Sequence, residues 1–277
     1  MAELLWPHWP KLESRMKKRG VMLFLDYDGT LTPIVRHPSL ARLSPPRRKF
    51  LEMLTQVDDI KTAIISGRSL AELKQLIRVK GILYVGNHGL EFEDPQLHFI
   101  HPKAQTAQAL LKQVAQKLTQ ALEDFPEVWV EDKTLTLSIH YRKLNESKAI
   151  FVRKIFSNIL QPYLRISKLA LTEGKKVWEV RPPTPWNKGR MVLWLLARFQ
   201  AHLPKKVFPI YAGDDRTDED AFRALKGKGI TLKVAEHRSE STEASYYVRS
   251  PSEVFLFLRK LKALKEKERE VLLHGSS

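Results

Sequence analysis

Apolar and polar positions divide most of the chain into short hydrophobic runs and longer amphipathic segments. Residues 21–25 are apolar without a break and turn residues follow at once, which is typical of a strand buried in a parallel sheet. Segments with an apolar face at helical spacing follow several such runs. This alternation predicts an α/β fold with a doubly wound, Rossmann-like parallel sheet and right-handed crossovers. The predicted strands of this sheet are residues 21–25, 60–65, 83–85, 207–212, 230–234 and 245–248.

The middle of the chain follows a different pattern, in the order helix, hairpin, helix, hairpin. The strand over residues 134–142 alternates, so that Leu137 and Ile139 share one face while His140 and Arg142 share the other. Such an order is typical of an α+β unit with a half-solvated antiparallel sheet. The predicted helices are residues 103–124 and 146–160, the second ended by Pro162, and the other strands are residues 128–131, 166–172 and 176–181. We therefore predict an α+β domain at residues 102–181, inserted into a core formed by residues 1–101 and 182–277.

Three further expectations concern individual helices. Residues 1–20 should pack as a lead-in helix, and the charged tail from Lys265 should fray. Thr217 should cap the helix that follows the acidic run at residues 213–220.

Composition narrows the class of protein. The chain has 277 residues, of which 43% are hydrophobic, as in an ordinary globular protein. It contains no cysteine, which excludes disulfides, thiolate zinc sites and cysteine nucleophiles and agrees with the cytoplasmic location that we expect. No apolar run approaches a transmembrane length, and the first ten residues do not resemble a signal peptide. The net charge of +16 is compatible with an anionic partner, but the basic residues are mixed with acids along the chain, which favours a solvated surface.

The first candidate for chemistry lies directly after the strand at residues 21–25. Asp26 and Asp28 are two positions apart, so in an extended chain both carboxylates aim at one spot beyond the carboxyl end of the strand. Open α/β sheets bind ligands at that edge, and two close carboxylates need a cation or a shared proton. Oxygen ligands suit Mg²⁺. A solvated acidic turn is the alternative, since Asp and Gly are ordinary turn residues.

Further polar residues follow other predicted strands or begin a helix. They are Ser66, Lys188, Asp214, Asp215 and Asp218. Each alone is compatible with a turn, a surface lysine or an acid at a helix start. Together they fit phosphoryl transfer from a monoester, in which a carboxylate attacks phosphorus, a second acid protonates the leaving oxygen, and cations hold the phosphate.

Several motifs carry a resemblance to a known family. The general ones are D-Y-D-G-T at residues 26–30, I-S-G-R at 65–68, N-K-G at 187–189 and G-D-D-R-T-D-E-D at 213–220. More specific ones are L-T-P-I-V at 31–35, G-N-H-G-L-E at 86–91, E-D-K-x-x-x-x-S-I-H-Y-R at 131–142 and G-K-K-V-x-E-V-R-P at 174–182. The chain resembles the phosphatases of the haloacid dehalogenase (HAD) superfamily, and within them the trehalose-6-phosphate phosphatases.

The resemblance implies a role for each matching residue. Asp26 would be the nucleophile and Asp28 the general acid and base. Mg²⁺ would be held by Asp26, the Asp28 carbonyl and Asp214, with Asp215 and Asp218 behind these ligands. Phosphate would be bound by Ser66, Gly67 and Lys188, while the inserted domain would close as a cap and contact the sugar. The expected substrate-binding residues are Arg68, His88, Glu131, Lys133, His140, Arg142, Lys175 and Glu179.

Two qualifications belong to this set. The family more often has Asp where this chain has Asn187, which removes one possible partner of Lys188. A merely solvated polar sheet face is the alternative for the charged residues of the insert, and ordinary hydrogen-bonded histidines are the alternative for His88 and His140.

The expected partner is a small sugar phosphate, with no nucleic acid and no membrane, and the resemblance adds a trehalose-phosphate synthase of the same pathway. A capped phosphatase for another sugar phosphate, such as sucrose phosphate or a glycosyl phosphoglycerate, is a rival hypothesis. So is a basic nucleic-acid-binding protein on a degenerate phosphatase fold. Against the last, no catalytic position is degraded and the lysines form no single stripe interleaved with aromatic residues.

Overall fold

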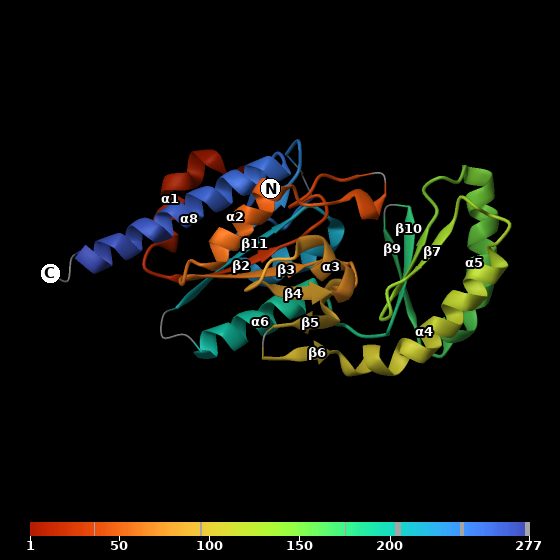
Figure 1. Cartoon of the computed structure of the whole chain (residues 1–277). Coiled ribbons are helices and arrows are strands. Elements are labelled where there is room, and N and C mark those ends of the chain that lie inside the picture. The colour runs from red at the N-terminus through yellow and green to blue at the C-terminus, as the bar shows by residue number, and fades with distance from the viewer. Residues whose placement is uncertain (36, 95, 175, 203–205, 239–240, 275–277) are drawn as a thin grey trace. The chain divides into compact units, whose positions relative to one another are not determined.

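The structure is a computed structural model that describes the chain except residues 36, 95, 175, 203–205, 239–240 and 275–277 (Figure 1). It divides into two compact units. The core unit comprises Met1–His98 and Trp186–Ser277, and the insert comprises Phe99–Pro185. Each unit has a sheet and a hydrophobic core of its own.

The core unit is built on a sheet with nine strands among the described residues, in the order β1-β13-β12-β11-β2-β3-β4-β5-β6, of which β6 begins at the last residue of the core unit, His98, and continues into the insert. Its pairs are parallel from β1 to β4, and β5 pairs antiparallel with β4. The predicted α/β fold with a doubly wound parallel sheet is therefore confirmed. The strands are β1 (Glu3–Leu4), β2 (Gly20–Leu25), β3 (Ile60–Ile65), β4 (Leu83–Gly86), β5 (Glu91–Glu93), β6 (His98–Ile100), β11 (Val207–Gly213), β12 (Ile230–Val234) and β13 (Tyr246–Val248).

Strand β2 lies between β11 and β3, and all six of its residues are buried. Leu23 and Leu25 belong to the hydrophobic core shared by helices α1, α2, α3 and α8, whereas Phe24 stacks on Tyr211 of β11. Helix α6 lies on the other side of the sheet from α1, α2 and α8 in Figure 1. The helices are α1 (Trp9–Met16), α2 (Pro45–Thr55), α3 (Leu70–Ile77), α6 (Lys188–His202), α7 (Glu219–Leu225) and α8 (Pro251–His274). A strand covered on both faces explains the unbroken apolar run in the sequence.

Both ends of the core unit differ from the prediction. Residues 1–20 form the short strand β1, a 3₁₀ turn at Trp6–His8 and then α1, rather than one helix. Helix α8 continues to His274 instead of fraying from Lys265, which is buried. The ammonium of Lys265 donates to the carbonyls of Met16 at 2.7 Å and Arg19 at 2.8 Å, at the end of α1. By binding carbonyls at the end of α1, Lys265 anchors α8 to that helix. The charge pattern of the sequence could not reveal this contact.

In the part of the insert that the structure describes, two helices pack on one face of a four-stranded antiparallel sheet. The helices are α4 (Pro102–Ala121) and α5 (Glu146–Arg165), and the strands, in sheet order, are β7 (Trp129–Asp132), β8 (Leu137–His140), β10 (Val177–Arg181) and β9 (Ala170–Gly174). Leu111 of α4 and Phe156 of α5 share one core with Ile139 and Trp178 of the sheet. The predicted α+β order is therefore present in the insert.

Two details of the insert were predicted wrongly. Pro162 lies inside α5 and does not end it, because Tyr163 and Leu164 still pack against the core of the insert. Strand β8 ends at His140, so Arg142 lies beyond it in a turn and is exposed. The expectation that His140 and Arg142 share a strand face is wrong, since the alternation does not continue past the last paired residue. Among the described residues of both units, every helix is too short or too polar to span a bilayer.

Candidate active site

Three carboxylates meet at the carboxyl end of the parallel sheet of the core unit. Asp26 directly follows β2 and Asp214 directly follows β11, the strand paired with it. The backbone N–H of Asp26 donates to the carbonyl of Ala212 at 2.9 Å, which fixes this alignment. One carboxylate oxygen each of Asp26, Asp214 and Asp218 lies within 4.8 Å of the others. We refer to these three residues as the acid cluster.

Lys188 lies within hydrogen-bonding distance of this cluster and is only 2% exposed. Its Nζ donates to Asp26 Oδ1 and to Asp218 Oδ1, both at 2.7 Å. Burial alone would lower the pKa of Lys188, but the negative charges of Asp218 and Asp26 outweigh burial and raise this pKa well above its usual value. Lys188 is therefore a permanent cation, and a buried cation needs such partners.

Asp218 is the fully buried anchor of this lysine. Besides Lys188, its Oδ1 accepts from the hydroxyl of Tyr211 at 2.7 Å, and its Oδ2 accepts from the backbone N–H of Asp215 at 2.9 Å. Burial opposes the charge, but Lys188 and these donors prevail and lower the pKa of Asp218. The three donors engage both oxygens, so Asp218 serves to hold Lys188 in place. Sequence reasoning missed Tyr211, although a phenol in an otherwise apolar strand, two residues before Gly213, was a usable signal.

Asp215 and Asp218 also form the capping box of the 3₁₀ turn at Arg216–Asp218, which leads into α7. The expected cap at Thr217 is wrong. A buried Asp218 can serve the turn and Lys188 together, whereas Thr217 lies inside the turn.

In Asp26 and Asp214 the charged form of the carboxylate is destabilised. Burial raises the pKa of Asp26 well above its usual value, and Lys188 offsets this only in part. Burial, followed by the charge of Asp218, raises the pKa of Asp214 to about 7. A divalent cation would favour the charged form of both carboxylates, and an all-oxygen donor set suits a hard cation. The residues present therefore fit a metal ion of this kind.

A glycine lets the chain approach Asp214 at this point. Gly29 has a φ of +80°, and a Cβ there would lie 2.1 Å from Asp214 Oδ2. Only glycine can combine this backbone conformation with so close a carboxylate.

The alternation expected after β2 would aim the carboxylates of Asp26 and Asp28 at one spot. In the structure Asp28 is not part of the acid cluster. The chain leaves the extended conformation after β2, and the carboxylate of Asp28 is held by Arg68 instead. The guanidinium donates from Nε to Oδ2 and from Nη2 to Oδ1, both at 2.7 Å. Arg68 is 5% exposed and also bonds to Glu72 and to the carbonyl of Pro38. In this conformation Arg68, predicted to bind substrate, is therefore a partner of Asp28.

The segments after β3 and β4 lie next to each other. Ser66 is buried, and its hydroxyl accepts from the backbone N–H of Arg68 at 3.2 Å. The backbone N–H of His88 donates to the carbonyl of Ser66 at 2.9 Å. Gly67 faces the ring of His88, where a Cβ would lie 2.4 Å from the imidazole. The structure thus brings Ser66, Gly67 and His88 together after strands that neighbour β2.

Asn187 has a role that does not involve Lys188. Its side-chain oxygen accepts from the backbone N–H of Arg190 at 2.9 Å and so caps the start of α6. Lys188 has Asp26 and Asp218 as partners instead. An aspartate at position 187 is therefore not needed to hold the lysine.

Several of the charged residues predicted in the insert share one face of its sheet. His140 Nε2 lies 2.9 Å from Glu131 Oε2, and Lys133 lies 3.8 Å from the same oxygen. Glu131 and Glu179 both pair with Ser138 in the register, from opposite sides, so their side chains emerge on the same face. The predicted Lys175 lies outside the described residues. Sequence reasoning missed Trp129, which stacks on His140 with ring centroids 4.5 Å apart.

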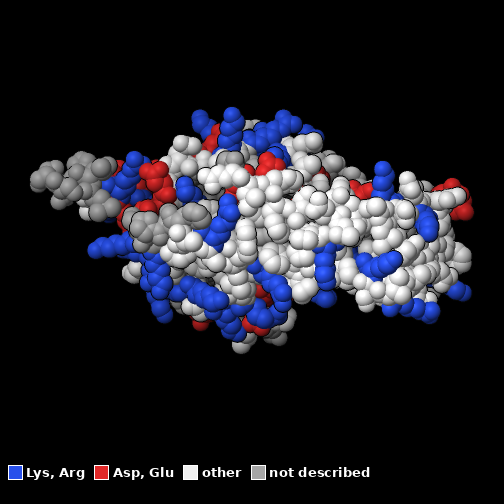
Figure 2. Space-filling view, turned by 90° about the horizontal axis from the view of Figure 1, so that it is seen from below, with Lys and Arg blue, Asp and Glu red and all other residues white. Residues whose placement is uncertain are grey.

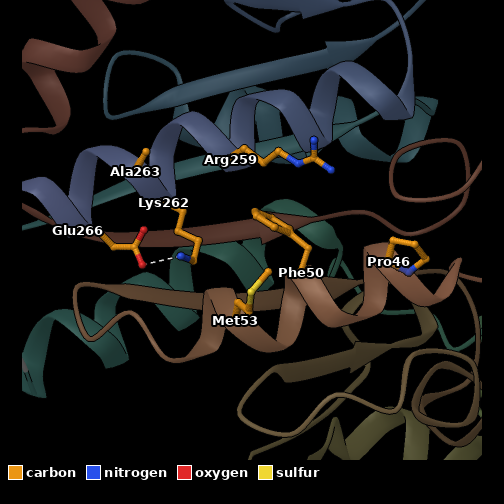
Figure 3. Close-up of a pocket in the computed structure, with 7 residues that line it drawn as sticks. All are labelled: Pro46, Phe50, Met53, Arg259, Lys262, Ala263 and Glu266. Atoms are coloured by element: carbon orange, nitrogen blue, oxygen red, sulfur yellow. Dashed lines mark hydrogen bonds and ion pairs between the residues drawn. The ribbon is translucent and has the colours of Figure 1, made fainter.

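A groove elsewhere on the core unit contains none of the predicted residues. It lies between α2 and α8, has a volume of about 380 Å³ and is open to solvent (Figure 3). Phe50 and Met53 of α2 face Arg259 and Lys262 of α8 across it. Its lining contains one carboxylate, that of Glu266, and so offers no counterpart of the acid cluster.

Comparison with known proteins places the chain in a family. A sequence model of the family described as "Trehalose-phosphatase" matches residues 24–252. "Trehalose-phosphate phosphatase B" of Arabidopsis thaliana is 34% identical over 270 residues, covering 93% of this chain and 70% of that protein. "Trehalose 6-phosphate phosphatase RA3" of Zea mays is 35% identical over 265 residues, covering 90% and 72%.

A solved structure agrees. The C-terminal domain of trehalose-6-phosphate phosphatase from C. albicans superposes with a TM-score of 0.78 at 26% identity, covering 95% of this chain and 99% of that chain. The fold class and the resemblance predicted from the sequence are thereby confirmed. The chain belongs to the trehalose-phosphatase family of the HAD superfamily.

Proposed function

We propose that the protein hydrolyses trehalose 6-phosphate to trehalose and inorganic phosphate through a phosphorylated aspartate. The observation that carries this proposal is the buried pair of Asp26 and Lys188 within the acid cluster. The pair fixes one oxygen of a carboxylate directly after the central strand and places a permanent cation beside it. Family membership supports the choice of substrate.

In the first step an oxygen of Asp26 attacks phosphorus, and the bond between phosphorus and the sugar oxygen breaks. Asp28 gives a proton to that sugar oxygen. In the second step Asp28 takes a proton from water, which attacks the phosphorylated Asp26 and releases phosphate. After the first step and before the second, Arg68 would hold the carboxylate of Asp28 in place, since the guanidinium binds both of its oxygens.

Mg²⁺ would be held by Asp26, Asp214 and the backbone carbonyl of Asp28, with Asp215 and Asp218 behind them. When bound, it supplies positive charge that offsets repulsion between the carboxylates and the phosphate dianion. The raised pKa values of Asp26 and Asp214 support this assignment, because these groups lack sufficient positive charge without a metal.

Phosphate would be held by Ser66, Gly67 and Lys188. An ammonium has three N–H donors, and the acid cluster accepts two of those of Lys188. The third is available for a phosphate oxygen. Charge-assisted hydrogen bonds of this kind are the strong ones.

The insert would act as a cap that binds the sugar. Glu131, Lys133, His140 and Glu179 would contact its hydroxyl groups, since carboxylates and cations accept and donate strongly. Arg142 and Lys175 from the insert and Arg68 and His88 from the core unit complete the proposed set. The shared sheet face of Glu131 and Glu179 supports this assignment over a set of unrelated surface charges.

The decisive experiment measures phosphate release from trehalose 6-phosphate by the purified protein, with Mg²⁺ and after chelation. Sucrose phosphate and a glucosyl phosphoglycerate serve as comparison substrates. Preference for trehalose 6-phosphate and dependence on Mg²⁺ are the expected results. Faster release from a comparison substrate would assign the same chemistry to that substrate.

The distribution of positive charge on one face of the molecule argues against a nucleic-acid partner. On the face shown in Figure 2, Lys and Arg form several separate groups with acidic residues among them. A binding assay with duplex and single-stranded DNA at physiological salt tests this rival hypothesis. The cytoplasmic location and a synthase of the same pathway as partner stay predictions.

A further inference from the structure

The insert carries an aromatic side chain that the proposed chemistry leaves unused. Trp129 is the first residue of β7 and pairs with His140 of β8 in the register. It lies two positions before Glu131, so its side chain emerges on the same face of the sheet as that carboxylate. The indole stacks on the imidazole of His140 with an angle of 17° between the rings.

The hydrophobic core of the insert does not explain this tryptophan. The described residues that form this core lie on the helix-covered face of the sheet, and Trp129 is not among them. That face has its own stacked aromatics, Trp178 with Tyr141 and Phe156. Trp129 remains 38% exposed on the polar face. The indole packs on the imidazole of His140 and leaves part of its surface open on the polar face, where a ligand can reach it.

The neighbours of Trp129 define the chemistry of that ligand. Next to the indole lies His140, whose Nε2 is 2.9 Å from Glu131 Oε2, and Lys133 lies 3.8 Å from the same oxygen. A flat apolar surface thus continues directly into strong hydrogen-bonding groups. A pyranose ring has the matching shape, with C–H bonds on its faces and hydroxyl groups around its edge. Ligand sites commonly combine aromatic surfaces with a few fixed polar groups in this way.

We propose that Trp129 is a specificity-determining residue that stacks on a pyranose ring of the sugar phosphate while Glu131 binds its hydroxyl groups. This proposal rests on the proposed function, because it assumes that the polar face of the insert binds the sugar. His140 links the two contacts: its ring supports the indole and its Nε2 orients Glu131.

The test compares Trp129→Ala, Trp129→Phe and Phe151→Ala with wild type. Phe151 is the matched control, an aromatic residue of α5 in the same unit that is 57% exposed and contacts Phe125. For Trp129→Ala we expect the KM for trehalose 6-phosphate to rise about tenfold, with kcat changed less. Hydrolysis of p-nitrophenyl phosphate, which has no sugar, should stay within about twofold of wild type. Trp129→Phe, which keeps a flat ring, should lose less, and Phe151→Ala should behave as wild type on both substrates.

A second measurement separates contact with the sugar from an effect through His140. Saturating trehalose should change the tryptophan fluorescence of wild type and of Phe151→Ala but not that of Trp129→Phe. Wild-type kinetics in Trp129→Ala, or a fluorescence change in Trp129→Phe as large as that of wild type, would overturn the inference and leave the proposed function intact. A wild type that cleaves p-nitrophenyl phosphate but no sugar phosphate would instead refute the proposed function itself.

Discussion

Lys188 donates to Asp26 and Asp218 at the same distance, 2.7 Å, and so ties the residue after β2 to the turn after β11. Replacing it by methionine should leave two buried carboxylates without their cation. We expect a loss of about 3 to 5 kcal/mol in the free energy of unfolding, together with loss of phosphatase activity. Urea unfolding and phosphate release measure the two effects.

Lys228→Met is the control, because the side chain of this exposed lysine bonds only to the carbonyl of Ala224 among the contacts described for it. It should match wild type in both measurements. A Lys188→Met protein as stable as wild type would show that the two carboxylates are neutral in the absence of the lysine.

Asp26→Asn and Asp28→Asn should differ in how they depend on the leaving group. Asp26→Asn should lose activity on every phosphomonoester, because an amide cannot attack phosphorus. Asp28→Asn should release trehalose very slowly in the first turnover but should release p-nitrophenol much faster, because nitrophenolate leaves without a proton. Later turnovers should be slow on both substrates, because Asp28 also activates water in the second step. Measurements of the first turnover on both substrates check this. Equally slow first turnovers would remove Asp28 from the role of general acid.

Metal binding should stabilise the folded protein through Asp214. We expect Mg²⁺ to raise the Tm of wild type and to have no such effect on Asp214→Asn, because a ligand that binds only the folded state shifts the unfolding equilibrium. Thermal unfolding with and without Mg²⁺ gives the answer independently of catalysis. An undiminished shift in Asp214→Asn would place the cation elsewhere. EDTA should abolish activity, and added Mg²⁺ should restore it.

Replacing Glu131 or Glu179 of the insert should weaken recognition of the sugar without altering the phosphate chemistry. Glu131→Ala and Glu179→Ala should each lower turnover of trehalose 6-phosphate about tenfold or more, if each loses a charge-assisted hydrogen bond. The same variants should scarcely alter hydrolysis of p-nitrophenyl phosphate. Glu127→Ala, which removes a surface partner of Lys148 in the same unit, is the control. Equal losses on both substrates in a folded protein would argue that the insert does not bind the sugar.

Tyr84 of β4 should make stability depend on alkaline pH. Its hydroxyl accepts from the backbone N–H of Val79 at 3.0 Å and donates to the carbonyl of Val79 at 2.7 Å. Burial raises the pKa of this phenol, so its contribution to stability is complete below the unfolded value of about 10 and is lost as the pH rises through the higher folded value.

Tyr84→Phe should therefore lose stability at neutral pH, by about 1 kcal/mol for each hydrogen bond. It should also fall less steeply than wild type above about pH 10. Urea unfolding across this range compares the two proteins. Parallel curves would mean that another group controls the alkaline loss.

The sequence predicted the parts of the site that follow from strand order. The apolar runs before Asp26 and Asp214 indicated buried parallel strands, whose carboxyl ends meet at one edge. Which strands are neighbours, and hence that β2 pairs with β11, depends on pairing between distant segments. The contact of the Arg68 guanidinium with Asp28 could not be predicted, because it depends on the local turns after β2 and β3. The contact of Tyr211 with Asp218 was missed, although a phenol in an apolar strand was a signal for it.

In the insert the sequence indicated a polar sheet face but extended β8 too far. Periodicity shows which residues alternate, whereas the end of a strand depends on where its partner stops. Arg142 was assigned to a strand that ends two residues earlier. Trp129 was overlooked because an aromatic residue in a strand usually belongs to the core, although its spacing from Glu131 already placed it on the polar face, as the register with His140 agrees.

The long separation between Asp26 and Lys188, 162 positions along the chain, has a consequence for synthesis on the ribosome. Strand β2 emerges early, but its neighbour β11 emerges only after the entire insert. The insert is one contiguous segment with its own hydrophobic core, so it can form while β2 still lacks a partner on one edge. The apolar segment before Asp26 is then exposed during elongation, and chaperones that bind nascent chains should engage the protein there until β11 arrives.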